Sequence, residues 1–203
     1  MAASFPVAGS GWQVKARSTT NDPAPFQMTW YAFCATPPPG YRIIKKTETV
    51  PNGQTVGLTC STDKVPYEFM VNVGAEAKGT TAALTTSSRW TNPSSTITYA
   101  AGGGARSDAS TVGIDLYAIC TDAYDGSTDW YKQGRSSHDI NEGPLWACPA
   151  DRTSIGVTFS SDASLRSSKP HTISLSDWRL TGININRNKY AYDIDGGVVC
   201  ARR

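Results

Sequence analysis

The pentapeptide LYAIC at residues 116–120 is an apolar run that ends in a cysteine, and runs of this kind recur twice in the chain. WYAFC at residues 30–34 matches it closely, and GGVVC at residues 196–200 matches it more weakly. The three closing cysteines lie 86 and 80 residues apart. Such a period predicts one supersecondary unit used several times, because repeated units bury their apolar faces against one another.

Tryptophans support the same period. Trp12 lies 22 residues before Cys34, and Trp178 lies 22 residues before Cys200. A proline precedes each tryptophan position and its counterpart in the middle of the chain: Pro6, Pro93 and Pro170. We therefore expect one β-rich repeat domain over residues 1–203, with a partial repeat at 1–34 that lacks its opening half, a repeat at 60–120 and a repeat at 148–200.

Composition narrows the class of protein. Charged residues make up 18% of the chain, against about 25% in ordinary soluble domains, and 39% hydrophobic residues is too many for a disordered chain. No apolar run approaches the roughly 18 residues of a membrane span. A net charge of +2 without a dense basic cluster argues against nucleic acid as a partner.

The local patterns predict an all-β fold of antiparallel sheets built from about three repeats, with a β-sandwich or jelly roll as the alternative. Short alternating or β-branched segments are separated by turn residues, and no segment combines a helical period with caps. Residues 102–104, GGG, are typical of a turn. Residues 121–144 lack a strand pattern, so a long loop is expected there.

The five cysteines form no Cys-x-x-Cys pair, which makes disulfides in an oxidising compartment a better explanation than zinc. If the closing cysteine of one unit bonds to the opening cysteine of the next, Cys34 joins Cys60 and Cys120 joins Cys148. Cys200 is then left over. The alternative is that all five are buried thiols in a reducing compartment.

Several of these motifs together resemble small secreted repeat proteins of actinobacteria: CP at residues 148–149, GGA at 103–105, YAIC at 117–120 and the tryptophans before closing strands. The triple repeat ending in cysteine is also similar to the vitelline membrane outer layer protein family. That resemblance implies a β-prism-like fold of three Greek-key sheets around a pseudo-threefold axis. The chain departs from it in its missing half unit and its long 121–144 segment.

No catalytic residue is predicted. The two histidines, His138 and His171, have no Gly-x-Ser-x-Gly partner motif, and Asp115 is the one carboxylate that lies within an apolar strand. Alternation places Asp115 on the face opposite its apolar neighbours, toward solvent. Asp122 and Asp125 are weak calcium candidates, although acidic residues beside glycine are also typical of turns. No cofactor is expected.

Exposed aromatic residues are the candidate contact patch, because they offer large contact area at small entropic cost. Asp129, Trp130 and Tyr131 lie inside the expected long loop, and Trp90 and Trp146 lie in or beside other loops. The alternative is that these side chains fold onto their own sheet.

These features favour a non-catalytic recognition or structural module, extracellular or on a virion surface. Its partner is either a cell-envelope glycan or a neighbouring subunit of an assembly or oligomer, such as a capsid decoration or a tail. A recognisable signal peptide is missing at residues 1–6, which fits prior removal or release within a virus particle. A neighbouring chain could complete the missing half unit by strand addition. A secreted polysaccharide hydrolase is the rival hypothesis.

Overall fold

The computed structural model describes most of the chain as β-strands. No helix long and apolar enough to cross a membrane occurs in this described part. The described residues are 1–7, 11–16, 29, 37, 40–60, 69–79, 81–91, 99–121, 128–139, 145–161, 164–170, 177–183 and 191–202.

Fourteen strands occur in these residues, and all their pairings are antiparallel. The predicted all-β antiparallel fold is thereby confirmed. The strands are β1 (Ala3–Val7), β2 (Gly11–Lys15), β3 (Arg42–Pro51), β4 (Thr55–Thr59), β5 (Phe69–Lys78), β6 (Ala83–Thr91), β7 (Tyr99–Arg106), β8 (Thr111–Thr121), β9 (Thr128–Asp139), β10 (Leu145–Ala147), β11 (Arg152–Ser161), β12 (Ser164–Pro170), β13 (Asp177–Ile183) and β14 (Ala191–Arg202).

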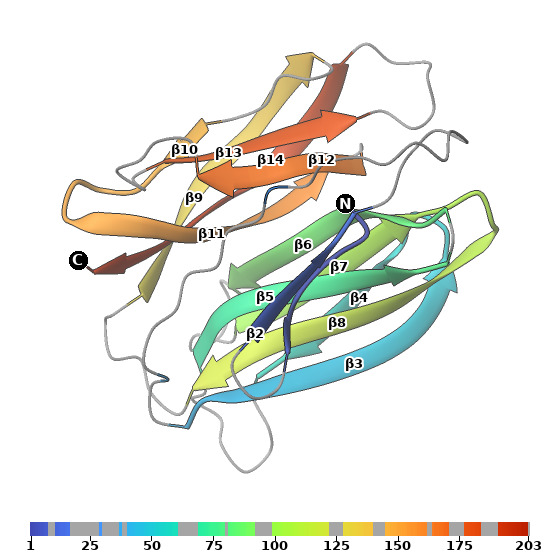
Figure 1. Ribbon diagram of the computed structural model, residues 1–203, viewed down its shortest axis with the longest axis horizontal. Coiled ribbons are helices and arrows are strands. Elements are labelled where there is room, and N and C mark those ends of the chain that lie inside the picture. Colours follow the sequence, from blue (N-terminus) through green and yellow to red (C-terminus); the bar gives the residue numbers. More distant parts are fainter. Residues whose placement is uncertain are drawn as a thin grey trace.

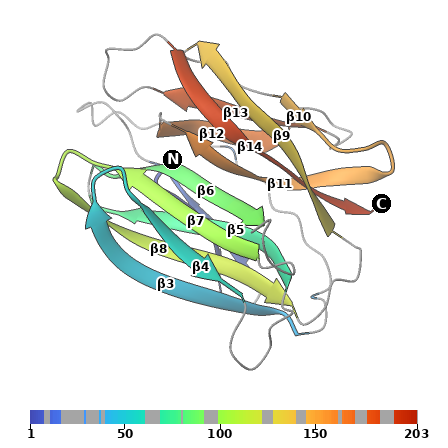
Figure 2. The ribbon, with the colours of Figure 1, turned by 180° about the vertical axis from the view of Figure 1, so that it is seen from behind.

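Three sheets organise the strands, in the orders β2-β1-β5-β8-β3, β10-β13-β12 and β4-β7-β6-β11-β14-β9. The molecule has two lobes, a first lobe of β1–β8 and a second lobe of β9–β14 (Figure 1). The six-stranded sheet passes through both lobes, and the reverse view shows it nearest the viewer (Figure 2). The five-stranded sheet faces its β4-β7-β6 half, and the three-stranded sheet faces its β11-β14-β9 half. Each lobe is therefore two facing sheets with an apolar core between them.

The pairings within β9–β14 follow the same order as those within β3–β8. In the first set the last strand, β8, lies between β3 and β5, while β7 lies between β4 and β6. In the second set β14 lies between β9 and β11, while β13 lies between β10 and β12. The two sets join edge to edge where β6 pairs with β11.

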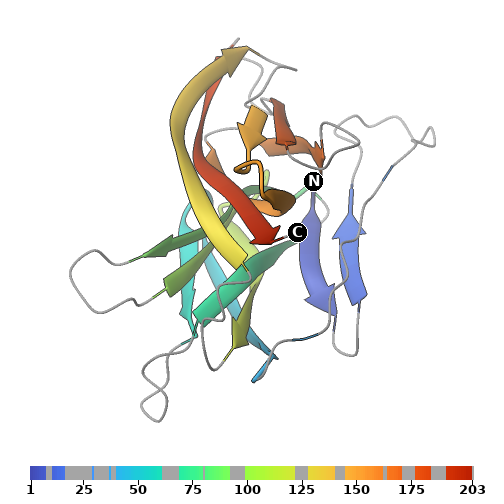
Figure 3. The same ribbon diagram turned by 90° about the vertical axis from the view of Figure 1, so that its left-hand side faces the viewer.

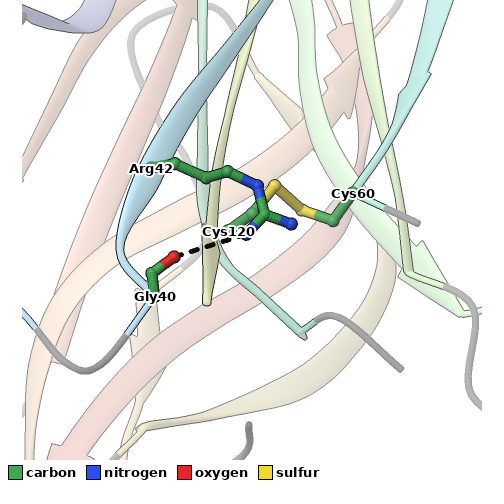
Figure 4. Close-up of a disulfide and its surroundings, with 4 residues drawn as sticks. All are labelled: Gly40, Arg42, Cys60 and Cys120. Carbon is green, nitrogen blue, oxygen red and sulfur yellow. Dashed lines mark hydrogen bonds between the residues drawn. A yellow bond between two sulfur atoms is a disulfide. The ribbon is translucent and has the colours of Figure 1, made fainter. Parts of the chain in front are cut away.

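Each lobe has one disulfide between its two sheets. Cys60, directly after β4, bonds to Cys120 in β8 with 5.7 Å between the Cα atoms (Figure 4), and Cys148, after β10, bonds to Cys200 in β14 with 5.9 Å. The predicted pairings Cys34–Cys60 and Cys120–Cys148 are therefore wrong, and Cys200 is not left over. Cys60 bonds to Cys120 because β8 lies in the sheet that faces β4, and Cys148 bonds to Cys200 because β14 lies in the sheet that faces β10.

The two bridges lie within the apolar cores. Cys60 and Cys120 belong to the larger core, which also contains Met70, Leu84 and Leu116. In the same lobe the Arg42 guanidinium lies beside the bridge, and its Nη1 donates a hydrogen bond of 3.5 Å to the carbonyl oxygen of Gly40 (Figure 4).

Two segments expected to be irregular are strands. Residues 102–104 lie in β7, where a Cβ on Gly103 would come 3.0 Å from Leu116 Cδ1, so the glycine allows the two sheets to approach. Residues 128–139, expected within the long loop, form β9, which runs beside β14 along its length (Figure 3). Thr121 ends β8, and the other residues of that expected loop, 122–127 and 140–144, lie outside the described part.

Removing the first bridge through the pair of substitutions Cys60→Ala and Cys120→Ala should lower the free energy of unfolding by about 4 kcal/mol, because the bridge closes a segment of 60 residues. Urea denaturation measures the loss. As a control, Cys34→Ser should leave both bridged peptides intact in a non-reducing peptide map. In the parent protein, a bridged peptide joining Cys34 to Cys60 would contradict the pairing of Cys60 with Cys120.

Replacing Gly74 by alanine should lower the free energy of unfolding by about 1–3 kcal/mol. A Cβ at this position would lie 2.6 Å from both Phe5 Cα and the Ser4 carbonyl oxygen, so β1 must shift off the sheet. Gly57 in β4 is the matched control, since a Cβ there meets nothing within 4 Å. Equal loss of stability in the two variants by thermal denaturation would show that β1 does not lie against Gly74.

Candidate functional site

The predicted aromatic contact patch is not a loop. Asp129, Trp130 and Tyr131 lie in β9, where their backbones are opposite those of Cys200, Val199 and Val198. Trp90 lies in β6, opposite Ala100 in β7. The side chains of these four residues are outside the described part, so their role as a contact surface stays a prediction.

Trp146 is 3% exposed and packs in the core of the second lobe with Phe159 and Ile194. Its prediction as a surface contact is therefore wrong, because a buried ring cannot stack on a ligand. The short strand β10 explains the difference, since its middle residue faces the core while Leu145 and Ala147 are exposed. Gly196 lies close by, and a Cβ there would come 2.8 Å from Trp146 Cη2.

The calcium candidates Asp122 and Asp125 lie outside the described residues. Within the described part of the chain, no three acidic, histidine or cysteine side chains form a group that could hold a metal ion.

The most polar buried site is a cluster of carboxylates and lysines on the outer face of the five-stranded sheet, which we call the Asp115 cluster. Asp115 in β8 is 2% exposed, and the Glu76 side chain in β5 is 8% exposed. The two residues are directly opposite each other in the β5–β8 register. Three lysines, Lys15, Lys45 and Lys78, are about half-exposed and cover the carboxylates.

The lysines contact the carboxylates at short range and from three different strands. Lys45 Nζ lies 2.7 Å and Lys78 Nζ lies 3.0 Å from Asp115 Oδ2. Glu76 accepts hydrogen bonds from Lys15 Nζ (2.5 Å) and Lys78 Nζ (2.8 Å). The Thr47 hydroxyl, opposite Asp115 on β3, donates to Asp115 Oδ1 at 2.8 Å. The cluster thus connects β2, β3, β5 and β8.

Alternation correctly placed Asp115 on the face opposite Ile114 and Leu116, which lie in the core. Its predicted exposure to solvent is wrong, because lysines that are distant in sequence converge over it. The sequence contains these lysines, but only the register of β3, β5 and β8 brings them together.

Both carboxyl groups are held in the ionised form. Burial raises the pKa of Asp115, but hydrogen bonds from Lys45, Lys78 and Thr47 outweigh that effect and lower its pKa to about 2. Burial likewise raises the pKa of Glu76, and hydrogen bonds from Lys15 and Lys78 reverse the effect, so its pKa is lowered. The same contacts raise the pKa of Lys45 and of Lys78.

A stacked aromatic pair extends the cluster. The rings of Phe5 and Tyr117 lie 4.7 Å apart and nearly parallel, and both are buried. Lys15 Nζ lies over Phe5 and Lys45 Nζ lies over Tyr117, each 5.4 Å from the ring centroid. Lys15 and Phe5 therefore attach the β1–β2 hairpin to the rest of the sheet.

This arrangement is suited to clamping strands rather than to acid–base chemistry. A glycosidase needs one carboxylic acid with a raised pKa that can donate a proton, beside a carboxylate. Here the pKa values of Glu76 and Asp115 are both lowered. Both carboxylates are also covered by lysines, so neither is placed to reach a glycosidic oxygen.

Comparison with known proteins found no matching family model, no similar curated protein and no similar solved structure.

The substitution Asp115→Asn should lower stability at neutral pH by about 2 kcal/mol, the free-energy equivalent of lowering the pKa from 3.8 to about 2. The ionised group contributes fully above the unfolded-state pKa, and the contribution is lost as pH falls through the folded-state pKa. The variant should therefore show a flatter fall in stability between about pH 4 and pH 2.

Urea denaturation at a series of pH values measures both effects. Glu48→Gln is the matched control, because Glu48 forms an exposed pair with Lys46 at 2.9 Å and should cost less than about 1 kcal/mol. Parallel stability curves for D115N and the parent protein below pH 4 would contradict the role assigned to Asp115.

Proposed function

We propose that the chain is a non-catalytic structural module that works outside the reducing cytoplasm by contacting neighbouring subunits of a larger assembly. The observation that carries this proposal is the recurrence of one pairing order in β3–β8 and β9–β14. A scaffold built by repeating one unit offers equivalent edges, which suit assembly.

We take β3–β8 and β9–β14 as two units of six strands each, so that β5 and β11 are third strands and β6 and β12 are fourth strands. The β1–β2 hairpin is then interpreted as the fourth and fifth strands of an earlier unit. β1 pairs with β5 as β6 pairs with β11, and β2 pairs with β1 as β7 pairs with β6. The same proline–tryptophan pair occurs in the hairpin and in the last unit. Pro6 is opposite Trp12 across β1 and β2, and Pro170 is opposite Trp178 across β12 and β13. This agreement between register and sequence spacing supports three homologous units.

The closing strands support the same interpretation. Ile-Asp stands at the same distance before the closing cysteine in β8 (residues 114–115) and in β14 (residues 194–195). Each closing strand then bonds through its cysteine to the segment that opens its unit. In this scheme the fourth strand of one unit pairs with the third strand of the next, which is how a β-prism-like ring of three shared sheets would form.

The cellular setting follows from the disulfides. Two bridges in one chain indicate an oxidising environment, because reducing compartments keep thiols unpaired. A secreted protein and a component of a virion surface both satisfy this condition. A glycan partner depends on the side chains of Trp90, Trp130 and Tyr131, whereas Trp146 is buried and cannot take part.

The rival hydrolase hypothesis has little support from the described residues. Its strongest carboxylate pair, Glu76 and Asp115, is ionised and covered by lysines. If the chain were a hydrolase, polysaccharide incubated with it would release reducing sugar through another pair of residues.

Analytical ultracentrifugation of the purified chain, together with fractionation of its native source, tests the proposed function. We expect concentration-dependent oligomers, or recovery of the chain only in a particle or a larger complex. A chain that stays monomeric at every concentration and is recovered free from its source would contradict the proposal. Binding to a glycan array that is lost in Trp130→Ala would instead identify a lectin.

A further inference from the structure

Two strand pairings in the molecule, β1 with β5 and β6 with β11, have the same geometry. The fourth strand of one unit pairs with the third strand of the following unit, as β1 does with β5 and β6 does with β11. Both pairings are antiparallel and two residue pairs long. Ala3 and Ser4 of β1 are opposite Glu76 and Ala75, and Thr86 and Ser87 of β6 are opposite Ser160 and Phe159.

The registers of these two junctions are equivalent. β5 has a bulge after Met70, which is opposite Cys120, and β11 has a bulge after Ser154, which is opposite Cys200. Counted from that point, Ala75 and Phe159 occupy the same position, and both are opposite a serine, Ser4 or Ser87. Two independent junctions thus use one geometry.

The chain contains a third strand of the same kind as β1 and β6. β12 has a bulge between Leu165 and Ser167, as β6 has between Leu84 and Thr86. Counting from the bulge, Ser167 and Ser168 correspond to Thr86 and Ser87. β13 pairs with one edge of β12, and β12 ends the three-stranded sheet among the strands that the structure describes.

We infer that the outer edge of β12 accepts an antiparallel strand from a partner chain, and that this strand is of the β5/β11 type. It pairs at Ser167 and Ser168 as the third strand of a neighbouring unit. An unpaired strand edge presents backbone donors and acceptors in a row, which an added strand satisfies. This inference rests on the proposed function, because it names the edge through which the module contacts its neighbour.

A second copy of the chain does not provide the strand without rearrangement. β5 is already paired on both sides, with β1 and β8, and β11 is paired with β6 and β14. Because neither described strand of this type has a free edge, the partner that we infer is a different chain that carries a strand of the β5/β11 type with one unpaired edge.

The probe is a synthetic peptide with the sequence of β11, residues 152–161, added to the full chain with its disulfides intact. Amide hydrogen exchange followed by mass spectrometry reports on residues 164–170. We expect exchange there to slow by about tenfold or more at saturating peptide, because new ladder hydrogen bonds protect the amides. A peptide N-methylated at the positions of Phe159 and Ser160 is the matched control and should give no protection.

Protection of residues 164–170 by the unmodified peptide alone supports the inference. No protection at millimolar peptide, equal protection by the N-methylated peptide, or protection confined to the edge strands β3, β4 or β9 would overturn it. The outcome is separable from that of the proposed function. If the chain occurs in a particle but the peptide does not slow amide exchange at residues 164–170, only the inference about the β12 edge is refuted. If the peptide slows exchange there but the chain is always free and monomeric in its source, only the proposed assembly role is refuted.

Discussion

The fold depends on two closing strands, β8 and β14, each hydrogen-bonded on both sides and covalently tied to the facing sheet. Pairing on both sides fixes the order of the strands around each closing strand. The cysteine near the end of each closing strand then fixes its distance from the opposite sheet. Because both constraints act on the same strand, the apolar residues that alternate along β8 can pack against the small residues of β7.

That packing is the reason for the glycines and alanines of β7. Ala101, Gly103 and Ala105 of β7 face the larger core, and Leu116 and Ile114 of β8 fill the space that they leave. A second consequence lies on the outer face, where the same register places Asp115 under lysines from β3 and β5. The charge cluster and the apolar core are therefore two faces of one strand alignment.

Local patterns in the sequence are sufficient for the all-β fold class, and the apolar runs that end in Cys120 and Cys200 lie in strands β8 and β14. Local patterns fail where the information is not local. β9, TDWYKQGRSSHD, has polar residues at both even and odd positions, so no alternation of polar and apolar residues distinguishes it from a loop. The strand is stabilised by its pairing with β14. The residues GGG in β7 are typical of a turn, yet here the facing sheet requires the absence of side chains.

The disulfides and the Asp115 cluster show the same limit. Spacing alone allowed Cys120 to pair with Cys148 or with Cys60, and only the three-dimensional order of the strands decides between them. Alternation gave the correct face for Asp115, but its burial depends on Lys45 and Lys78, which the register brings from other strands. Sequence thus predicted the all-β class, while the pairing of strands and cysteines depended on long-range contacts.

Interstrand nuclear Overhauser effects in solution test the strand order around the two closing strands, β8 and β14, most directly. This strand order predicts contacts between the backbones of Ala75 and Leu116 in the first lobe and, at the equivalent place in the second lobe, between those of Phe159 and Gly196. It also predicts contacts between Ser87 and Phe159 at the junction of the lobes. Contacts of β14 with strands other than β9 and β11 would contradict this strand order.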